Sequence, residues 1–144
     1  MGGALAGAAA NGHLDVAAYL LGLGVNIHTV EDMALYNAIQ GRHPAMVEFL
    51  LENGADVLAR GKYFYNVALH DRLPETVELI EMYMAAHPSN IDKINLYWLG
   101  ASAFSDRFYS EKQLKIFARG LGLDSAGVSR EDLAQDIAER LGAV

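Results

Sequence analysis

An all-α fold built from stacked helix pairs is predicted by three features of the sequence. A segment recurs at a spacing of thirty residues: Asn11–Thr29 reads NGHLDVAAYLLGLGVNIHT, and Gly41–Ala59 reads GRHPAMVEFLLENGADVLA. In both copies a His precedes an apolar run with helical spacing, and a turn containing Gly follows it. No stretch indicates a β-strand beyond short extended pieces. A repeat of this period is typical of helix pairs that bury their apolar faces by stacking on their neighbours.

Composition and charge exclude several classes of protein. The 144 residues are 52% hydrophobic and 20% charged, which indicates a folded chain, and no apolar run approaches the ~20 residues of a membrane helix. The first residues lack the basic segment of a signal peptide. The chain has no Cys, so it can form neither a disulfide nor a thiolate metal site, and we expect a cytoplasmic protein. The net charge of −7 argues against a general nucleic-acid binder.

Three repeats are expected within residues 1–87, at about 3–29, 30–59 and 60–87. Each contains a short first helix and a longer, more apolar second helix. The expected helices are Ala4–Ala10, Leu14–Leu23, Asp32–Gln40, Pro44–Leu51, Tyr63–Leu69 and a last one from Pro74 to Ala86 or His87. The second helix of the first repeat is expected to bury Val16, Ala17, Leu20 and Leu21.

Residues 88–144 are predicted to form a divergent fourth helix pair and a C-terminal helix. A helix is expected from about Ile91 to Ser105, with Trp98 in the core. Ser110 and Gln113 have the spacing of a capping box, which predicts a helix over Glu111–Arg119. Ser129 begins the last helix.

The aligned repeats resemble ankyrin repeats. The matching residues of the first copy are Leu5, Ala8, Ala9, Gly12, His13, Val16, Leu20, Leu21, Gly24, Asn26 and Ile27. Those of the second copy are Leu35, Ala38, His43, Val47, Leu50, Leu51, Gly54, Ala55, Asp56 and Val57. Thirty-residue units without the Thr-Pro pair look like those of large DNA viruses, some bacteria and amoebae. The resemblance implies an ankyrin-type helical solenoid with a divergent C-terminal helical cap.

The resemblance also implies a non-catalytic protein-interaction module, an adaptor or inhibitor that binds a partner on its concave face. That face is built from the turns and the first helices. The turns offer Thr29, Glu31 and Asp32 as additional contacts, and Tyr and Arg are common interface anchors. The candidate partner-binding residues are Tyr36, Gln40, Arg42, Arg60, Lys62, Tyr63, His70 and Asp71.

Residues 110–141 are similar to the SAP, or helix-extension-helix, motif through Leu114, Lys115, Arg119, Leu121, Leu123, Gly127, Leu133 and Leu141. This resemblance implies nucleic-acid binding through Lys112, Lys115, Arg119 and Arg130. The basic loop continues into Glu131 and Asp132, however, so a helical unit that only closes the stack is the favoured interpretation. A further alternative is a structural subunit or homo-oligomer that assembles through the N-terminal end.

No catalytic residue, cofactor or metal site is predicted. The sequence lacks a phosphate-binding G-x-x-x-x-G-K-[ST] loop, a G-x-S-x-G nucleophile motif and an H-E-x-x-H zinc motif. His13 and His43 hold equivalent positions on helices that stack ~8–10 Å apart, too far to share a metal at ~2 Å. We expect both to hydrogen-bond the loop backbone.

Overall fold

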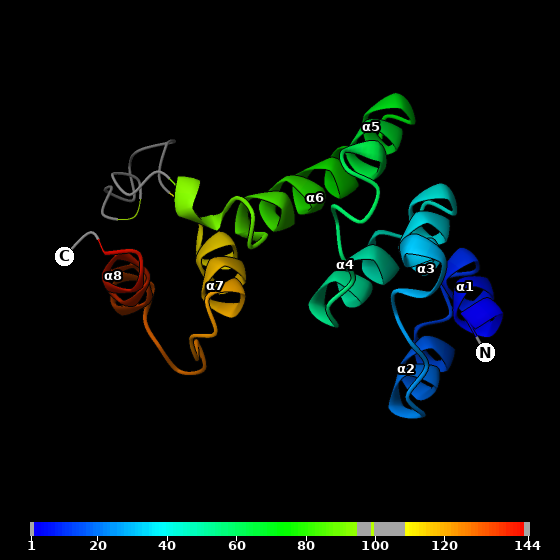
Figure 1. Cartoon of the computed structure of the whole chain (residues 1–144), viewed down its shortest axis with the longest axis horizontal. Coiled ribbons are helices and arrows are strands. Elements are labelled where there is room, and N and C mark those ends of the chain that lie inside the picture. The colour runs from blue at the N-terminus through cyan, green and yellow to red at the C-terminus, as the bar shows by residue number, and fades with distance from the viewer. Residues whose placement is uncertain (1, 95–98, 100–108, 143–144) are drawn as a thin grey trace. The chain divides into compact units, whose positions relative to one another are not determined.

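The computed structural model describes residues 2–94, 99 and 109–142 of the chain. The chain divides into two compact units, Met1–Glu81 and Met82–Val144, which we call unit 1 and unit 2 and describe separately. Every regular element among the described residues is helical, which confirms the predicted all-α fold (Figure 1). The elements are α1 (Gly2–Ala10), α2 (Leu14–Gly22), α3 (Thr29–Gln40), α4 (Pro44–Glu52), α5 (Tyr63–His70), α6 (Pro74–Ala86), the 3-10 turn η1 (Ile91–Lys93), α7 (Glu111–Gly120) and α8 (Arg130–Arg140). None of the helices described is long and apolar enough to cross a membrane.

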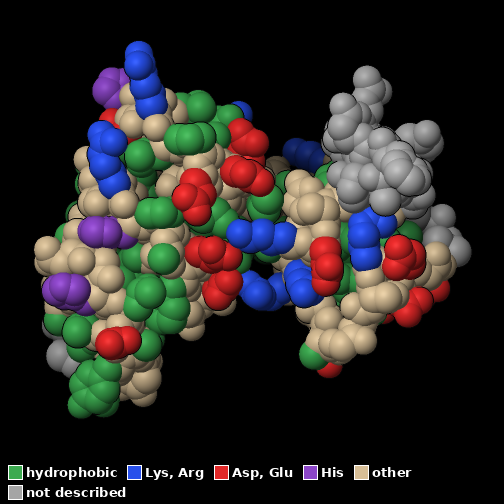
Figure 2. All heavy atoms as spheres, turned by 180° about the vertical axis from the view of Figure 1, so that it is seen from behind, with side chains coloured by type: hydrophobic (Ala, Val, Ile, Leu, Met, Phe, Trp, Pro, Cys, Tyr) green, Lys and Arg blue, Asp and Glu red, His purple; other side chains and the backbone are tan. Residues whose placement is uncertain are grey.

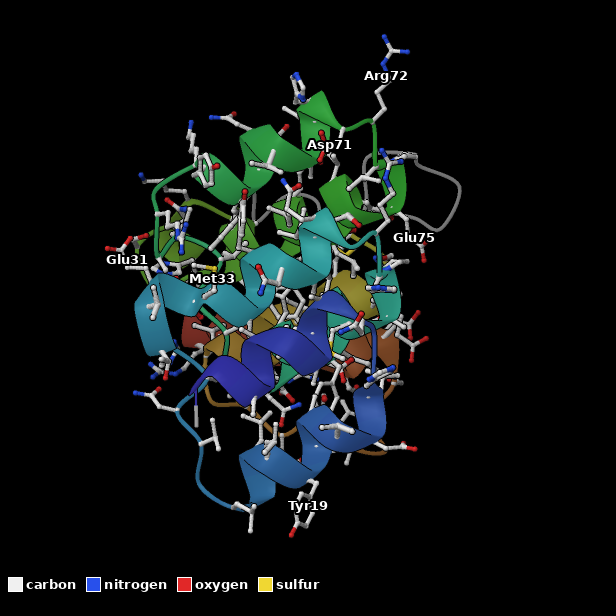
Figure 3. All side chains as sticks on the ribbon, turned by 90° about the vertical axis from the view of Figure 1, so that its right-hand side faces the viewer. Tyr19, Glu31, Met33, Asp71, Arg72 and Glu75 are labelled. Carbon is white, nitrogen blue, oxygen red and sulfur yellow. The ribbon has the colours of Figure 1, made fainter. Side chains whose placement is uncertain are left out.

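Unit 1 is a stack of helix pairs. Helices α1 and α2 form repeat 1, and α3 and α4 form repeat 2. Repeat 3 consists of α5 followed by α6. The first helices α1, α3 and α5 lie side by side (Figure 3). Buried residues recur at the thirty-residue period, as Leu5 and Leu35 or as Ala8, Ala38 and Ala68. The Ala side chains at these positions let neighbouring helices approach closely, so the sequence repeat is also the repeat of the core.

The loops after the first helices share one backbone conformation. Gly12, Arg42 and Arg72 occupy the same position in successive repeats, and all three have a positive φ, of 70°, 61° and 57°. The turns after the second helices are also alike in the first two repeats. The side-chain oxygen of Asn26 accepts a hydrogen bond from the backbone N–H of His28 at 2.9 Å, and Asp56 does the same with Leu58 at 2.9 Å.

The burial expected for Val16 is wrong. Val16 is not buried but 46% exposed, whereas Met46, one repeat later, is fully buried. Repeat 2 has repeat 1 on its N-terminal side, but no described element precedes repeat 1, so the same helix position meets solvent. Within α3, Val30, Glu31 and Asp32 are left-handed (φ 53°, 52° and 59°), so the right-handed part of the helix follows them, close to the start expected at Asp32.

Unit 2 packs α7 and α8 around a core that includes Leu114, Phe117, Leu133 and Ile137. The capping box predicted at Ser110 is confirmed, because Ser110 accepts from the backbone N–H of Gln113 and Gln113 accepts from that of Ser110. Ser129 likewise caps α8, accepting from the N–H of Asp132 at 3.2 Å.

The helix expected from Ile91 is not continuous. Ile91–Lys93 form only a 3-10 turn, and Ile94 follows with an extended ψ of 134°, which ends it. The rest of that predicted helix falls almost entirely outside the described residues, and Trp98 lies outside them.

Candidate functional site

Two tyrosines stack where repeats 2 and 3 meet. Tyr36 of α3 and Tyr63 at the start of α5 have ring centroids 5.8 Å apart and planes inclined by 20°. Tyr36 is half-buried and Tyr63 is 44% exposed. Hydrogen bonding between the two phenol groups raises the pKa of Tyr36 above its ordinary value. The pair therefore presents aromatic surface at a fixed position.

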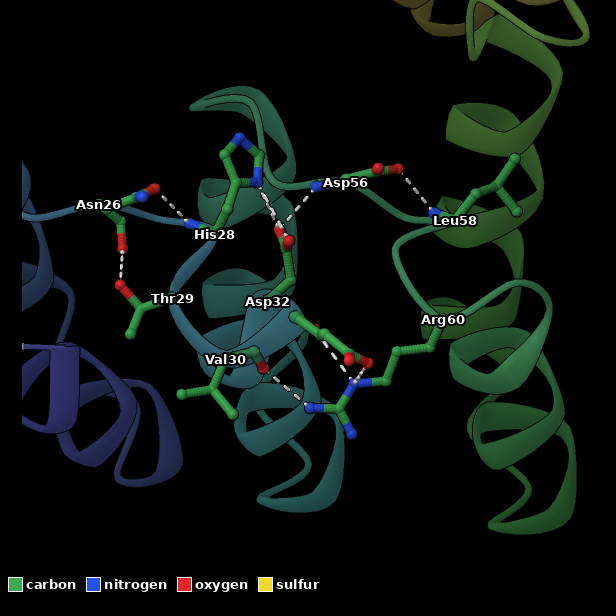
Figure 4. Close-up of polar contacts among 9 residues, drawn as sticks. Asn26, His28, Thr29, Val30, Asp32, Asp56, Leu58 and Arg60 are labelled. Atoms are coloured by element: carbon green, nitrogen blue, oxygen red, sulfur yellow. Dashed lines mark hydrogen bonds and ion pairs between the residues drawn. The ribbon is translucent and has the colours of Figure 1, made fainter.

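Arg60 links this aromatic pair to the preceding turn, and Figure 4 shows its contacts with that turn. Its Nε donates to the carbonyl of Glu31 at 3.1 Å, and its Nη2 donates to that of Val30 at 3.0 Å. Its guanidinium lies 5.4 Å from the Tyr36 ring centroid, within the range of a cation–π interaction. Arg60 thus satisfies two carbonyls of the left-handed segment and orders Tyr36 at the same time.

Asp32 is a structural residue of the same turn and not the surface contact that the sequence suggested. Its carboxylate is 2% exposed and accepts a hydrogen bond from the backbone N–H of Asp56 at 2.7 Å (Figure 4). It also accepts from Nδ1 of His28 at 3.0 Å. These contacts join the turn of repeat 2 to the turn that precedes repeat 3.

The other candidate contact residues lie in two places. Lys62 is exposed beside Tyr63, at the start of α5. Gln40 and Arg42 are exposed at the opposite end of α3, and His70 is exposed at the corresponding end of α5, where its Nδ1 lies 3.1 Å from the carboxylate of Asp71. The structure therefore brings Tyr36, Arg60 and Tyr63 together, and it places the remaining candidates along the same first helices.

Histidine organises one junction between repeats. Nε2 of His43 donates to the carbonyl of Ala10 at 3.0 Å, which confirms the role predicted for His43. A Cβ atom on Gly12 would lie 2.7 Å from Nδ1 of the same ring, so the loop of repeat 1 needs Gly at this position. Sequence reasoning missed a second bond of this junction, from the side-chain amide of Asn37 to the carbonyl of Ala6 at 3.1 Å. The position equivalent to Asn37 is Gly7 in repeat 1, so the repeat pattern gave no signal for it.

An open groove of about 530 Å³ runs along the side of α5 and α6 in unit 1. Most of its lining residues are apolar, and three are charged. The lining residues are Ala68, Leu69, Arg72, Leu73, Pro74, Val77, Glu78 and Glu81.

Among the basic residues proposed for nucleic-acid binding, Arg130, Arg119 and Lys115 make the following contacts within unit 2. Nη2 of Arg130 donates to the carbonyl of Tyr109 at 2.8 Å. Nη1 of Arg119 donates to the hydroxyl of Tyr83 at 3.0 Å, and Nζ of Lys115 pairs with Glu111 at 3.2 Å. Lys112 is exposed on α7. Arg130 in particular serves the fold of unit 2.

The geometry of a helix-pair stack agrees with the comparison to known families. The family model described as ankyrin repeats (many copies) matches residues 7–51, which span most of repeats 1 and 2. The similarity to ankyrin repeats is thus carried by residues 7–51 of the chain. Neither a curated protein nor a solved structure matches the chain.

Ankyrin repeats are generally protein–protein interaction modules, and the family is typically non-catalytic. Within the part of the chain that the structure describes, no group of three or more metal-ligating side chains could hold an ion.

Proposed function

We propose that this protein acts as an adaptor or inhibitor that binds another protein along the first helices α3 and α5, with Tyr36 and Tyr63 at the centre of the contact. The stacked pair is the observation that carries the proposal. Its rings are ordered before binding, one by Arg60 and both by each other, so little side-chain entropy is lost when a partner covers them. Aromatic residues of this kind are enriched among interface hot spots.

The net charge of unit 1 as a whole would attract a partner with a basic surface, whereas the contact around Tyr63 itself carries Arg60 and Lys62. Residues 1–81 contain ten Asp and Glu against four Lys and Arg. Acidic side chains gather on the face of unit 1 drawn in Figure 2. Opposite charge on a partner would speed its association and favour it over acidic competitors.

Affinity capture from a native extract, followed by mass spectrometry, tests the proposal. A partner retained by the wild-type protein should be lost with Tyr63→Ala, because truncating a hot-spot Tyr weakens binding by about 2 kcal/mol, or roughly thirtyfold. Tyr19→Ala is the matched control, since Tyr19 is also an exposed tyrosine but lies on α2. If the combined Tyr36→Ala, Arg60→Ala and Tyr63→Ala variant is still folded and captures the same partners, the assignment is wrong.

Nucleic-acid binding through residues 110–141 is the weaker alternative. Affinity for phosphates scales with the cations available, and Arg130 and Arg119 already donate to groups of unit 2. A salt-dependent mobility shift with DNA that Lys115→Ala with Arg119→Ala abolishes would support this alternative. If there is no mobility shift, or if the two substitutions leave the shift unchanged, nucleic-acid binding through residues 110–141 is excluded.

A further inference from the structure

The loop between the two helices has the same hydrogen-bonded backbone in all three repeats. In repeat 2 the N–H of Arg42 donates to the carbonyl of Ile39 at 3.1 Å, and the N–H of His43 donates to that of Ala38 at 3.1 Å. The equivalent bonds of repeats 1 and 3 are 2.9–3.3 Å long. This pair of bonds forms a Schellman motif, which ends a helix with a left-handed residue that is usually Gly.

Two of the three repeats have Arg where this motif favours Gly. Repeat 1 has Gly12 at the left-handed position, whereas repeats 2 and 3 have Arg42 (φ 61°) and Arg72 (φ 57°). Gly adopts a left-handed backbone without steric cost, and a residue with a Cβ atom does not. The backbone of the loop therefore gives no reason for Arg at either position.

The fold does not use the two Arg side chains either. Arg42 and Arg72 are both exposed, and neither forms a hydrogen bond or an ion pair with any residue that the structure describes. In Figure 3 Arg72 points away from the helices of unit 1. Arg60 provides the contrast, because its guanidinium donates to two backbone carbonyls. A residue that its loop disfavours and that makes no contact within the fold indicates a role outside the molecule.

The two arginines lie on the same edge of unit 1. Helices α3 and α5 are in contact, and equivalent residues on packed helices are about 8–10 Å apart. His70, whose side chain is 89% exposed, ends α5 beside Arg72. Lys, Arg and His side chains follow one another along one edge of unit 1 in Figure 2. We call Arg42, His70 and Arg72 the basic edge.

Few acidic side chains lie close to the basic edge. The first turn of α4, which follows Arg42, contains no acidic residue. Glu75 lies in the first turn of α6, but it is exposed and forms no ion pair with Arg72. The carboxylate of Asp71 lies 3.1 Å from Nδ1 of His70. Because α4 and α6 both begin at this edge, the positive ends of their dipoles add to its potential.

An acidic protein segment fits the basic edge better than a nucleic acid does. A guanidinium binds a carboxylate through two parallel hydrogen bonds, so two arginines suffice for a short segment with two carboxylates. Nucleic-acid affinity instead rises with the number of phosphates that basic residues neutralise. Unit 1 contains ten Asp and Glu against four Lys and Arg, and its net charge would repel a long polyanion.

We propose that the basic edge binds an acidic segment of a partner protein. One Asp or Glu carboxylate of the segment binds Arg42, and a second carboxylate, about 8–10 Å from the first, binds Arg72. His70 adds a hydrogen-bond donor next to the second carboxylate. Tyr63 begins α5, and the basic edge lies beyond the other end of that helix, so this site is separate from the contact built on Tyr63.

The test uses the full chain and a twelve-residue peptide that repeats Glu-Pro-Pro four times. A polyproline II helix has three residues per turn and rises 3.1 Å per residue, so this peptide presents Glu side chains on one side about 9 Å apart. In heteronuclear NMR spectra the Nε–H signals of Arg42 and Arg72 should shift during titration with this peptide. They should not shift with a peptide that repeats Gln-Pro-Pro. Arg42→Gly and Arg72→Gly should each weaken binding of the Glu peptide by about fivefold.

Lys93→Ala is the matched control for the two Arg substitutions. It also removes one exposed positive charge, but from η1 in unit 2, and it should leave the affinity for the Glu peptide unchanged. Because the loops favour Gly, Arg42→Gly and Arg72→Gly should not lower Tm. Weaker binding without a lower Tm identifies side chains that act outside the fold.

Four results would overturn the proposal. The first is an absence of shifts in both Arg signals with the Glu peptide. The second is an equal loss of affinity in Lys93→Ala, because net charge alone would then explain the binding. The third is a fall in Tm of about 4 °C or more in both Arg→Gly variants, which would show that the arginines serve the fold. The fourth is tighter binding of a single-stranded DNA twelve-mer than of the Glu peptide at the same edge, because the ligand would then be a nucleic acid.

Discussion

Replacing Asp32 with Asn tests whether the turn of repeat 2 holds repeats 2 and 3 together. The buried carboxylate accepts from the backbone N–H of Asp56 at 2.7 Å and from Nδ1 of His28 at 3.0 Å. Asn has nearly the same size, and it tolerates the left-handed backbone of residue 32 (φ 59°) as well as Asp does. The substitution therefore removes the negative charge and little else.

The expected loss follows from the two hydrogen bonds. A bond to a charged group contributes about 1.5–3 kcal/mol and a neutral one about 0.5–1.5 kcal/mol, so the bond from Asp56 loses about 1 kcal/mol. The contact with His28 adds only a few tenths of a kcal/mol, because half of the His28 side chain is exposed. We expect a total of about 1–1.5 kcal/mol. In a unit of this size each kcal/mol lowers Tm by about 4–8 °C.

Glu31→Gln is the matched control for Asp32→Asn. It removes the same charge from the neighbouring residue, but the Glu31 side chain is 74% exposed and approaches Arg60 only to 3.9 Å. We expect a loss below about 0.5 kcal/mol. Urea unfolding followed by circular dichroism gives the free energies, and hydrogen exchange reports the protection of the Asp56 amide. Equal losses in the two variants, or unchanged protection of Asp56 in Asp32→Asn, would refute the assigned role of Asp32.

Three further predictions concern single contacts. Gly12→Ala should lower the free energy of unfolding by about 1–3 kcal/mol, since the added Cβ meets the His43 ring and the backbone is left-handed; adding His43→Ala should relieve the steric part in urea titrations. Tyr63→Phe should bring the raised pKa of Tyr36 down toward ~10, as followed by tyrosinate absorbance. Because the folded pKa is the higher one, this bond stabilises the fold below pH ~10 and is lost as pH rises through the folded pKa. Ser110→Ala should destabilise unit 2 by about 1 kcal/mol in thermal melts, and Ser110→Thr should recover most of it.

The helices could be predicted from the sequence because their end signals are local. Pro44 and Pro74 begin α4 and α6, and the capping box at Ser110 begins α7. The left-handed segment from Val30 to Asp32 could not be predicted in this way. A β-branched residue with a φ of 53° is locally unfavourable. The conformation is held from thirty residues away, by the bonds from Arg60 to the carbonyls of Val30 and Glu31.

The candidate site was only partly accessible from the sequence. Residue type and repeat position singled out Tyr36, Arg60 and Tyr63, and the structure places these three in contact. The role of Arg60 in this group depends on the orientation of the turn that contains Val30 and Glu31. The spacing of residues along a helix does not define that orientation. Asp32 was misjudged for the same reason. A carboxylate in a turn is usually solvated, and only the approach of the Asp56 amide makes its burial favourable.

Equivalent positions in successive repeats differ in burial because the exposed fraction of a side chain depends on which element packs against it. Met46 is covered and Val16 is not, although both stand at the same helix position. The residue types on the two sides of a junction between repeats nevertheless match each other. Gly12 and His43 are such a pair, since a Cβ atom on residue 12 would lie 2.7 Å from Nδ1 of the His43 ring.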